Sequence, residues 1–204
     1  MSQKYELIAT DKTTLSGAPL LQIRALRKFS EVGIGDLGGY VQSEANLSQG
    51  SDNAWISGDA QVYGNAQVCG DAQVFGNARV YGDAQVFGDA WVFGNARVYG
   101  DAQVFGNAWV SGNARVSGNA QSTATHHVLS VTGLRWPMTS TTAGVQVGCH
   151  NHSMQVWKAD YARIGAENGL SPELAKEYFR LMKALRRIQR LEERAIKAAG
   201  EGEK

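Results

Sequence analysis

Residues 72–89 read AQVFGNARVYGDAQVFGD, which is three copies of a six-residue phrase closed by Gly-Asn or Gly-Asp. The phrase continues in both directions, so alanine recurs at every sixth position from Ala54 to Ala120. An aliphatic residue recurs in the same way from Ile56 to Val116. A fixed short period is typical of a solenoid, in which each repeat buries its apolar side by stacking on the next repeat.

The order of residues within the phrase predicts a strand and a corner. Ala and Val are two residues apart, so both face one side of an extended strand. The residue between them and the aromatic residue after Val face the other side. Gly adopts positive φ freely, and Asn and Asp adopt it more readily than most residues, so the closing pair predicts a turn.

A second period of eighteen residues sorts the outward positions into columns. Three phrases per coil would stack like residues about 4.8 Å apart, the spacing of neighbouring strands. The sequence therefore predicts a mostly β protein built on a triangular parallel β-helix with a Trp/Phe face, an Arg/Tyr face and a Gln/Phe face. The Trp/Phe face has Trp55, Gln73, Trp91, Trp109, Phe75 and Phe93; the Arg/Tyr face has Gln61, Arg79, Arg97, Arg115, Tyr63, Tyr81 and Tyr99; the Gln/Phe face has Gln67, Gln85, Gln103, Gln121, Cys69, Phe87 and Phe105.

An aliphatic residue followed four positions later by a small one, as in Val62 and Ala66, resembles the hexapeptide-repeat left-handed β-helix family. The resemblance implies a left-handed coil and a trimer. The family includes acyltransferases and metal-dependent carbonic anhydrases. Those enzymes use histidines on the coils, and residues 53–120 contain none. We therefore expect a protein without catalytic residues or cofactor, and an acyltransferase-like enzyme is the alternative.

Three further segments, 35–41, 46–48 and 145–149, resemble proteins encoded by enterobacterial prophages, which carry labels such as acyltransferase or polymer-forming protein. Aromatic residues expected after the cysteine of the last segment are His150 and His152 here. The resemblance implies a phage origin. For the non-enzymatic binding or scaffold protein that the outward ladders and the basic helix indicate, it also implies a host partner, such as a component of host defence.

Composition narrows the class of protein. The formal net charge of +1 gives no general attraction to nucleic acid or membrane, and we find no nucleic-acid motif. No apolar run approaches about 18 residues, and the first residues are polar, so neither a membrane span nor a signal peptide is predicted. The two cysteines, Cys69 and Cys149, are expected to be free thiols, which fits the cytoplasm of a bacterial host.

We expect three parts along the chain: an N-terminal β-hairpin cap (1–40), the β-helix (41–124) and a C-terminal strand-and-helix domain (125–204). An irregular stretch near 48–52 absorbs a three-residue change of phase. The predicted strands outside the repeats are 5–9, 20–26, 126–132 and 145–147, the predicted loops are 136–137 and 139–144, and a short helix is predicted at 157–168.

Ser171, Pro172 and Glu173 are typical of a helix start, and they predict a long amphipathic helix that runs to about Ala199. Its two faces are distinct. The apolar face has Leu174, Tyr178, Leu181, Leu185 and Ile188, and the basic face has Lys176, Arg180, Lys183, Arg187, Arg190 and Arg194.

Two surfaces are candidates for recognition. Outward aromatic rings would be stabilised by burial in a homo-oligomer, with a trimer favoured. The Arg/Tyr face could hold an anion, a nucleotide or an acidic protein, or could be a ladder that tolerates solvent. A small-ligand-sequestering oligomer is a further alternative. The interface candidates are Trp91, Phe93, Trp109, Phe87, Phe105, Leu181, Leu185 and Ile188, and the binding candidates are Arg79, Tyr81, Arg97, Tyr99 and Arg115.

Cys149, His150 and His152, with His126 and His127 upstream, form the one cluster of potential metal ligands in the sequence. A thiolate and two imidazoles suit zinc. However, Cys149 and His150 are adjacent and would point to opposite sides of a strand. We therefore expect no metal site, a buried structural cysteine and surface histidines.

Overall fold

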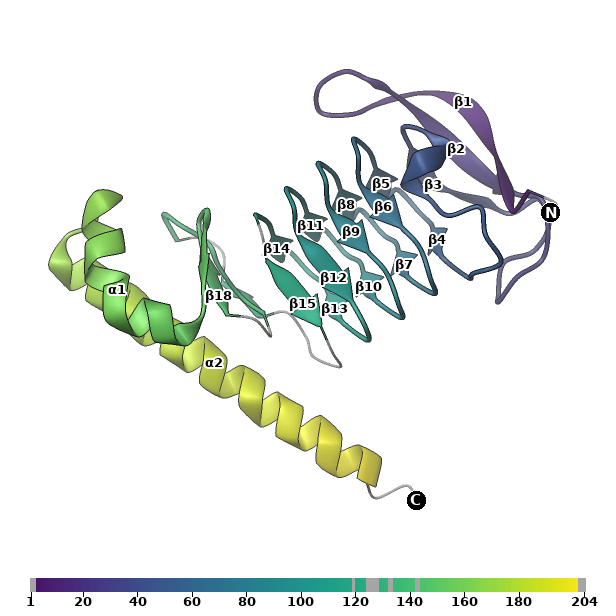
Figure 1. Cartoon of the computed structure of the whole chain (residues 1–204). Coiled ribbons are helices and arrows are strands. Elements are labelled where there is room, and N and C mark those ends of the chain that lie inside the picture. Colours follow the sequence, from purple (N-terminus) through teal and green to yellow (C-terminus); the bar gives the residue numbers. More distant parts are fainter. Residues whose placement is uncertain (1–2, 119, 124–128, 132–133, 142–143, 202–204) are drawn as a thin grey trace.

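The repeats form three parallel sheets whose strands lie eighteen residues apart. The computed structural model describes residues 3–118, 120–123, 129–131, 134–141 and 144–201, and Figure 1 shows the coils stacked between a hairpin and two helices. Trp91 pairs with Trp109, and Arg97 pairs with Arg115, so the predicted coil of three phrases is confirmed. Its hand remains a prediction. The repeat strands are β4 (Trp55–Ile56), β5 (Gln61–Val62), β6 (Gln67–Val68), β7 (Gln73–Val74), β8 (Arg79–Val80), β9 (Gln85–Val86), β10 (Trp91–Val92), β11 (Arg97–Val98), β12 (Gln103–Phe105), β13 (Trp109–Val110), β14 (Arg115–Val116) and β15 (Gln121–Thr123).

The interior of the solenoid consists of the small and aliphatic positions of the phrase. Every alanine from Ala54 to Ala120 and every valine from Val62 to Val116 is buried, as predicted from their two-residue spacing. Backbone amides bridge consecutive coils, as in the bond of 2.9 Å from the Arg79 nitrogen to the Ala96 oxygen. Each coil is therefore held by its neighbours through both apolar packing and hydrogen bonds.

Glycine allows the coils to approach each other at the corners. From Gly58 to Gly118 these glycines have φ between 60° and 74°, a region that side chains with a Cβ rarely adopt. A Cβ on Gly82 would lie 2.9 Å from the backbone nitrogen of Gly100 in the next coil. A Cβ on Gly112, in the last coil, would meet no atom within 4 Å. At the stacked corners, both the positive φ and the close backbone of the next coil therefore exclude a Cβ.

A hairpin extends the Arg/Tyr sheet at the N-terminal end. Strands β1 (Tyr5–Thr13) and β2 (Pro19–Ala25) are antiparallel, β3 (Leu37–Val41) pairs with β2, and β3 then pairs in parallel with β5. β1 is longer than predicted. Val41 pairs with Val62, which lies twenty-one residues later in the sequence. This separation is three residues longer than one coil of eighteen, so the predicted change of phase is confirmed.

A buried ion pair fixes the chain near this change of phase. The Lys4 side chain is 0% exposed, and its Nζ lies 2.6 Å from Asp52 Oδ1 and 3.1 Å from the Ala54 oxygen. Burial lowers the pKa of Lys4. Burial acts to raise the pKa of Asp52, but the hydrogen bonds and charge of Lys4, together with bonds from Ser48 and Gly70, lower it overall. This ion pair joins the N-terminal segment to the first full coil.

The C-terminal part is a four-stranded antiparallel sheet followed by two helices. The strands are β16 (Leu129–Val131), β17 (Met138–Ser140), β18 (Val145–Val147) and β19 (His150–His152). β18 confirms the predicted strand. β17 corrects the predicted loop at 139–144, because Met138–Ser140 pairs with both β16 and β18. Of the strand predicted at 126–132, positions 126–128 and 132 lie outside the described residues.

The two helices are α1 (Met154–Glu167) and α2 (Pro172–Glu201). α1 begins three residues earlier than predicted, because the Ser153 side chain accepts a hydrogen bond from the Val156 nitrogen and caps the helix there. α2 begins after Ser171, as predicted.

The last coil is closed by a side chain from the C-terminal sheet. The backbone nitrogen of Ser117 donates to Gln146 Oε1 at 3.1 Å, and Gln146 Nε2 donates to the Ser117 hydroxyl. Ser117 occupies the column of Tyr81 and Tyr99, and its short side chain is buried against Gln146. The side-chain oxygen of Gln146 thus accepts the hydrogen bond that a backbone oxygen of a further coil would accept at this point, as the Val116 oxygen does from the Tyr99 nitrogen.

Candidate functional site

The outward aromatic residues form straight stacks along the solenoid. The ring centroids of Phe75 and Phe93 are 4.9 Å apart, and those of Phe87 and Phe105 are 4.8 Å apart, with both pairs nearly parallel. These distances match the spacing of the strands that carry the rings. The structure therefore places the predicted aromatic columns as stacked ladders along the solenoid.

The Trp/Phe face has its most exposed part at the C-terminal end. Trp91 and Trp109 stack at 5.3 Å, and they remain 39% and 38% exposed. Phe75 meets Trp91 edge to face at 5.8 Å. Trp55 heads the same column but is buried, because Phe29 covers it. The Trp91–Trp109 stack is thus a flat apolar surface that the N-terminal cap does not cover.

The Arg/Tyr face combines stacked phenols with a row of cations. Tyr63, Tyr81 and Tyr99 stack with centroids 5.1 Å apart, and burial, followed by the neighbouring phenol, raises the pKa of Tyr81. Arg79 pairs in register with Arg97, which pairs with Arg115. Among the described residues, no carboxylate forms an ion pair with these three arginines.

Three like charges in one column repel each other, and an anion placed along the column would relieve that repulsion. The column ends beside the C-terminal sheet, where Tyr99 and Arg115 line a recess with Gln146 and Gly148. Arg115 remains exposed there. The structure therefore brings together all five residues that the sequence nominated for anion binding.

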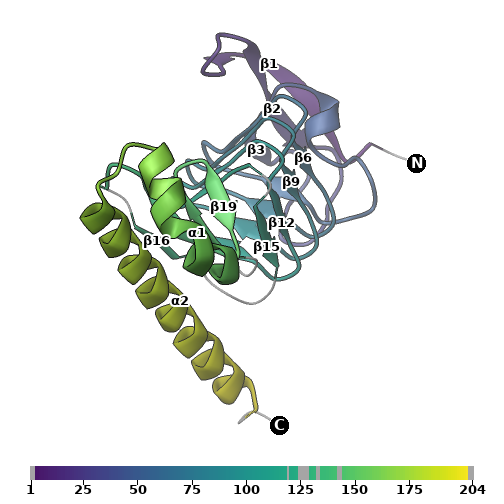
Figure 2. The ribbon, with the colours of Figure 1, turned by 60° about the vertical axis from the view of Figure 1, so that its left-hand side comes forward.

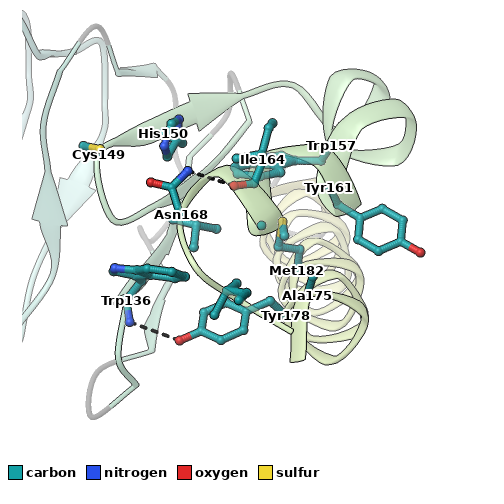
Figure 3. Close-up of a pocket in the computed structure, with 13 residues that line it drawn as sticks. Trp136, Cys149, His150, Trp157, Tyr161, Ile164, Asn168, Ala175, Tyr178 and Met182 are labelled. Atoms are coloured by element: carbon teal, nitrogen blue, oxygen red, sulfur yellow. Dashed lines mark hydrogen bonds between the residues drawn. The ribbon is translucent and has the colours of Figure 1, made fainter. Parts of the chain in front are cut away.

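The C-terminal part contains an apolar cavity of about 70 Å³, shown in Figure 3. Aromatic and aliphatic side chains, including Trp136, Trp157, Ile164 and Met182, line it. Hydrogen bonds fix two of its walls: Trp157 Nε1 donates to the Val145 oxygen at 2.6 Å, and the Trp136 nitrogen donates to Tyr178 Oη at 3.0 Å. A cavity of about 150 Å³ is known to take benzene, so this one takes only a smaller apolar group.

Cys149 and His150 lie at the edge of this cavity. Cys149 is exposed, which corrects the expectation of a buried cysteine, because it lies in the turn between β18 and β19. His150 lines the cavity, whereas His152 packs edge to face on Trp157 at 5.2 Å. Burial and the neighbouring charge of His150 lower the pKa of His152.

The described residues contain no group of three or more His, Cys, Asp or Glu side chains that could hold a metal ion. The rings of His150 and His152 lie side by side, 6.1 Å apart. His126 and His127, the two upstream candidates, lie outside the described residues.

The helix residues nominated for an interface do not share one environment. Leu185 is buried among Tyr178, Met182 and Trp157 of its own chain, so it does not belong to an accessible surface. Leu181 is partly buried beside this cluster, and Ile188 is exposed. Their spacing in the sequence predicts one shared face, and that predicted face does not include Leu191, which is also exposed.

Comparison with known families agrees with the coil geometry. A family described as YdcK Beta solenoid repeat matches residues 66–82, 72–88, 90–106, 102–118 and 108–122. This part of the chain is a repeat β-solenoid. No curated protein matches the sequence. The similarity covers the repeats alone, so it bears on the solenoid and not on the hairpin or the C-terminal part. None of the described helices has the length and apolar character to cross a membrane.

Proposed function

We propose that this repeat β-solenoid is a non-enzymatic binding scaffold that self-associates through its Trp/Phe face. The observation that carries the proposal is the exposed stack of Trp91 on Trp109. Contiguous exposed apolar surface is uncommon on soluble monomers and usually marks an interaction site. Three rungs of this face, residues 73–75, 91–93 and 109–111, contain no charged side chain, so removing them from water costs little.

A second copy of the chain is the occupant that the geometry favours. A ladder with rungs about 4.8 Å apart fits a partner with the same repeat distance, and an identical solenoid has it on every face. A symmetric ring of three chains would bury one such face in each copy, in line with the trimer implied by the resemblance to hexapeptide-repeat proteins.

Replacing Trp91 and Trp109 by serine should weaken self-association. Each buried indole contributes about 2 kcal/mol, so losing two costs about 4 kcal/mol, or roughly a thousandfold in the association constant. The mass from light scattering should fall below that of the unaltered protein.

Gln85→Ser with Gln103→Ser is the matched control, because it changes two stacked rungs of another face and removes no aromatic ring. An unchanged mass for the tryptophan double variant would rule out this interface. A fall in mass for both double variants would point to general disruption of the solenoid.

A second function, recognition of an acidic protein surface by the Arg/Tyr face, is supported by the three arginines in register without a carboxylate partner among the described residues. Guanidinium groups beside phenols can form charge-assisted hydrogen bonds while stacking on rings. The resemblance to prophage proteins suggests a host protein in the bacterial cytoplasm, such as a component of host defence, as the source of that acidic surface.

Arg79→Ala with Arg97→Ala should weaken binding of poly-L-glutamate, a model acidic polypeptide, by roughly tenfold at low salt, because two exposed ion pairs contribute about 0.7 kcal/mol each. Calorimetry at two salt concentrations measures the change. Lys28→Ala with Lys158→Ala removes two exposed cations elsewhere and should leave the affinity near that of the unaltered protein. Equal loss in both double variants would show attraction by net charge and not by this face.

A further inference from the structure

The α2 helix carries two apolar stripes, and only one of them is used within the chain. The first stripe packs on the C-terminal sheet and on α1. Its apolar members are Ala175, Tyr178, Met182 and Leu185, and the buried Gln189 continues it by accepting a hydrogen bond from the Ser140 hydroxyl. At 100° per residue, these positions lie within about 80° of one another around the helix axis. They account for the contact between α2 and its own domain.

The second stripe is displaced by roughly a third of a turn from the first. Its members follow one another at alternating intervals of three and four residues, the spacing of the a and d positions of a coiled coil. They are Leu181, Ala184, Ile188, Leu191, Ala195 and Ala198.

This second stripe lies on the surface. Leu181 is partly buried, while Ile188 and Leu191 are 48% and 53% exposed. Every described side chain of α2 after Gln189 is exposed, and both ribbon views show this half of the helix extending away from the rest of the chain (Figures 1 and 2). From Leu181 to Ala198 the stripe is about 26 Å long at 1.5 Å per residue.

We propose that the second stripe pairs with the same stripe of a second copy in a parallel coiled coil. Leucine and isoleucine in the middle of the stripe would interlock, and the alanines would let the two helices approach closely. A stripe of this length with two exposed aliphatic residues is otherwise unfavourable in water. The contact is separate from the Trp/Phe face, so it extends the proposed self-association without depending on that face.

Charge selects the parallel orientation. Arg180, Arg187 and Arg194 are seven residues apart and flank the stripe at the g positions. In an antiparallel pair, the g positions of the two helices face each other, so these arginines would repel across the contact. In a parallel pair, Arg187 and Arg194 face the e positions 192 and 199 of the partner helix, which the sequence fills with residues of no positive charge, whereas position 185 is buried within its own chain.

The first test measures mass in the Trp91→Ser, Trp109→Ser background, where the solenoid contact is weakened. Light scattering should give a mass near twice 22.0 kDa there, and adding Ile188→Gln with Leu191→Gln should lower it to that of one chain. Lys183→Gln with Arg190→Gln, on the side of the helix away from both stripes, should leave it unchanged. A monomer in the background itself, or no effect of the glutamines, would overturn the coiled coil, and neither result bears on the Trp/Phe contact.

The second test reports the direction of the two helices. In a chain with Cys69→Ser and Cys149→Ser, a cysteine introduced by Ala184→Cys should form a disulfide between copies under mild oxidation, because residues 184 of parallel helices are adjacent. In an antiparallel pair they would be about 16 Å apart, beyond the reach of a disulfide. Lys183→Cys should remain a free thiol. Absence of cross-linking at 184, or equal cross-linking at both positions, would contradict the parallel pair.

Discussion

Gly82→Ala is expected to lower the free energy of unfolding by about 2–5 kcal/mol. Alanine at the φ of 74° found there costs about 1–2 kcal/mol. Its Cβ would also lie 2.9 Å from the Gly100 nitrogen, and that contact can be relieved only by separating two coils. Overpacking of this kind costs roughly a further 1–3 kcal/mol. Urea unfolding followed by circular dichroism measures the loss.

Gly112→Ala provides the matched control. Gly112 occupies the same corner position with φ of 62°, but no atom lies within 4 Å of its added Cβ. It should therefore lose only the conformational part, about 1–2 kcal/mol. Equal losses at the two positions would mean that the contact between coils adds nothing, and that the backbone angle alone requires glycine.

Asp52→Ala should be the most damaging change outside the repeats. It leaves the fully buried ammonium of Lys4 without its counter-charge, which costs about 3–5 kcal/mol at neutral pH. Burial already lowers the pKa of Lys4 below 10.5. The unfolded chain therefore holds this proton at pH values where the folded chain has lost it, so the stability of the variant should rise as pH increases toward about 10.

Lys4→Met is the comparison for Asp52→Ala. The Asp52 side chain is 23% exposed and still accepts a hydrogen bond from the Gly70 nitrogen, so its charge remains solvated when the ammonium is removed. The loss should be less than half that of Asp52→Ala, and the recovery at high pH should be absent. If the lysine variant were the less stable of the two, the proposed asymmetry of burial would be wrong.

The sequence predicted the solenoid well because its information is local and repeated. The eighteen-residue columns set Trp91 over Trp109 and Arg79 over Arg97, and the structure confirms both registers. Inward and outward positions also followed from the two-residue alternation of a strand. No tertiary knowledge was needed, since each phrase packs on a copy of itself.

Features that depend on distant segments were not predictable. Trp55 and Trp91 occupy one column, yet Phe29 from the cap buries only the first. The strand Met138–Ser140 has no strong β pattern and is defined by its two neighbours. On α2, Leu185 and Ile188 are three residues apart and fit one face in sequence, but the position of the C-terminal sheet buries Leu185 and leaves Ile188 exposed.

The hydrogen bond from Ser117 to Gln146 closes the last coil, and it does not depend on how many coils precede it. Gln146 bonds to Ser117 of this last coil, so the same closure would fit a solenoid with more or fewer coils. Gain or loss of eighteen residues would therefore shift the two end structures by about 4.8 Å along the axis while preserving their relative orientation about it. The distance between the N-terminal hairpin and the C-terminal part is therefore set by the number of coils. Chains with different numbers of coils would hold the same two end structures at different distances.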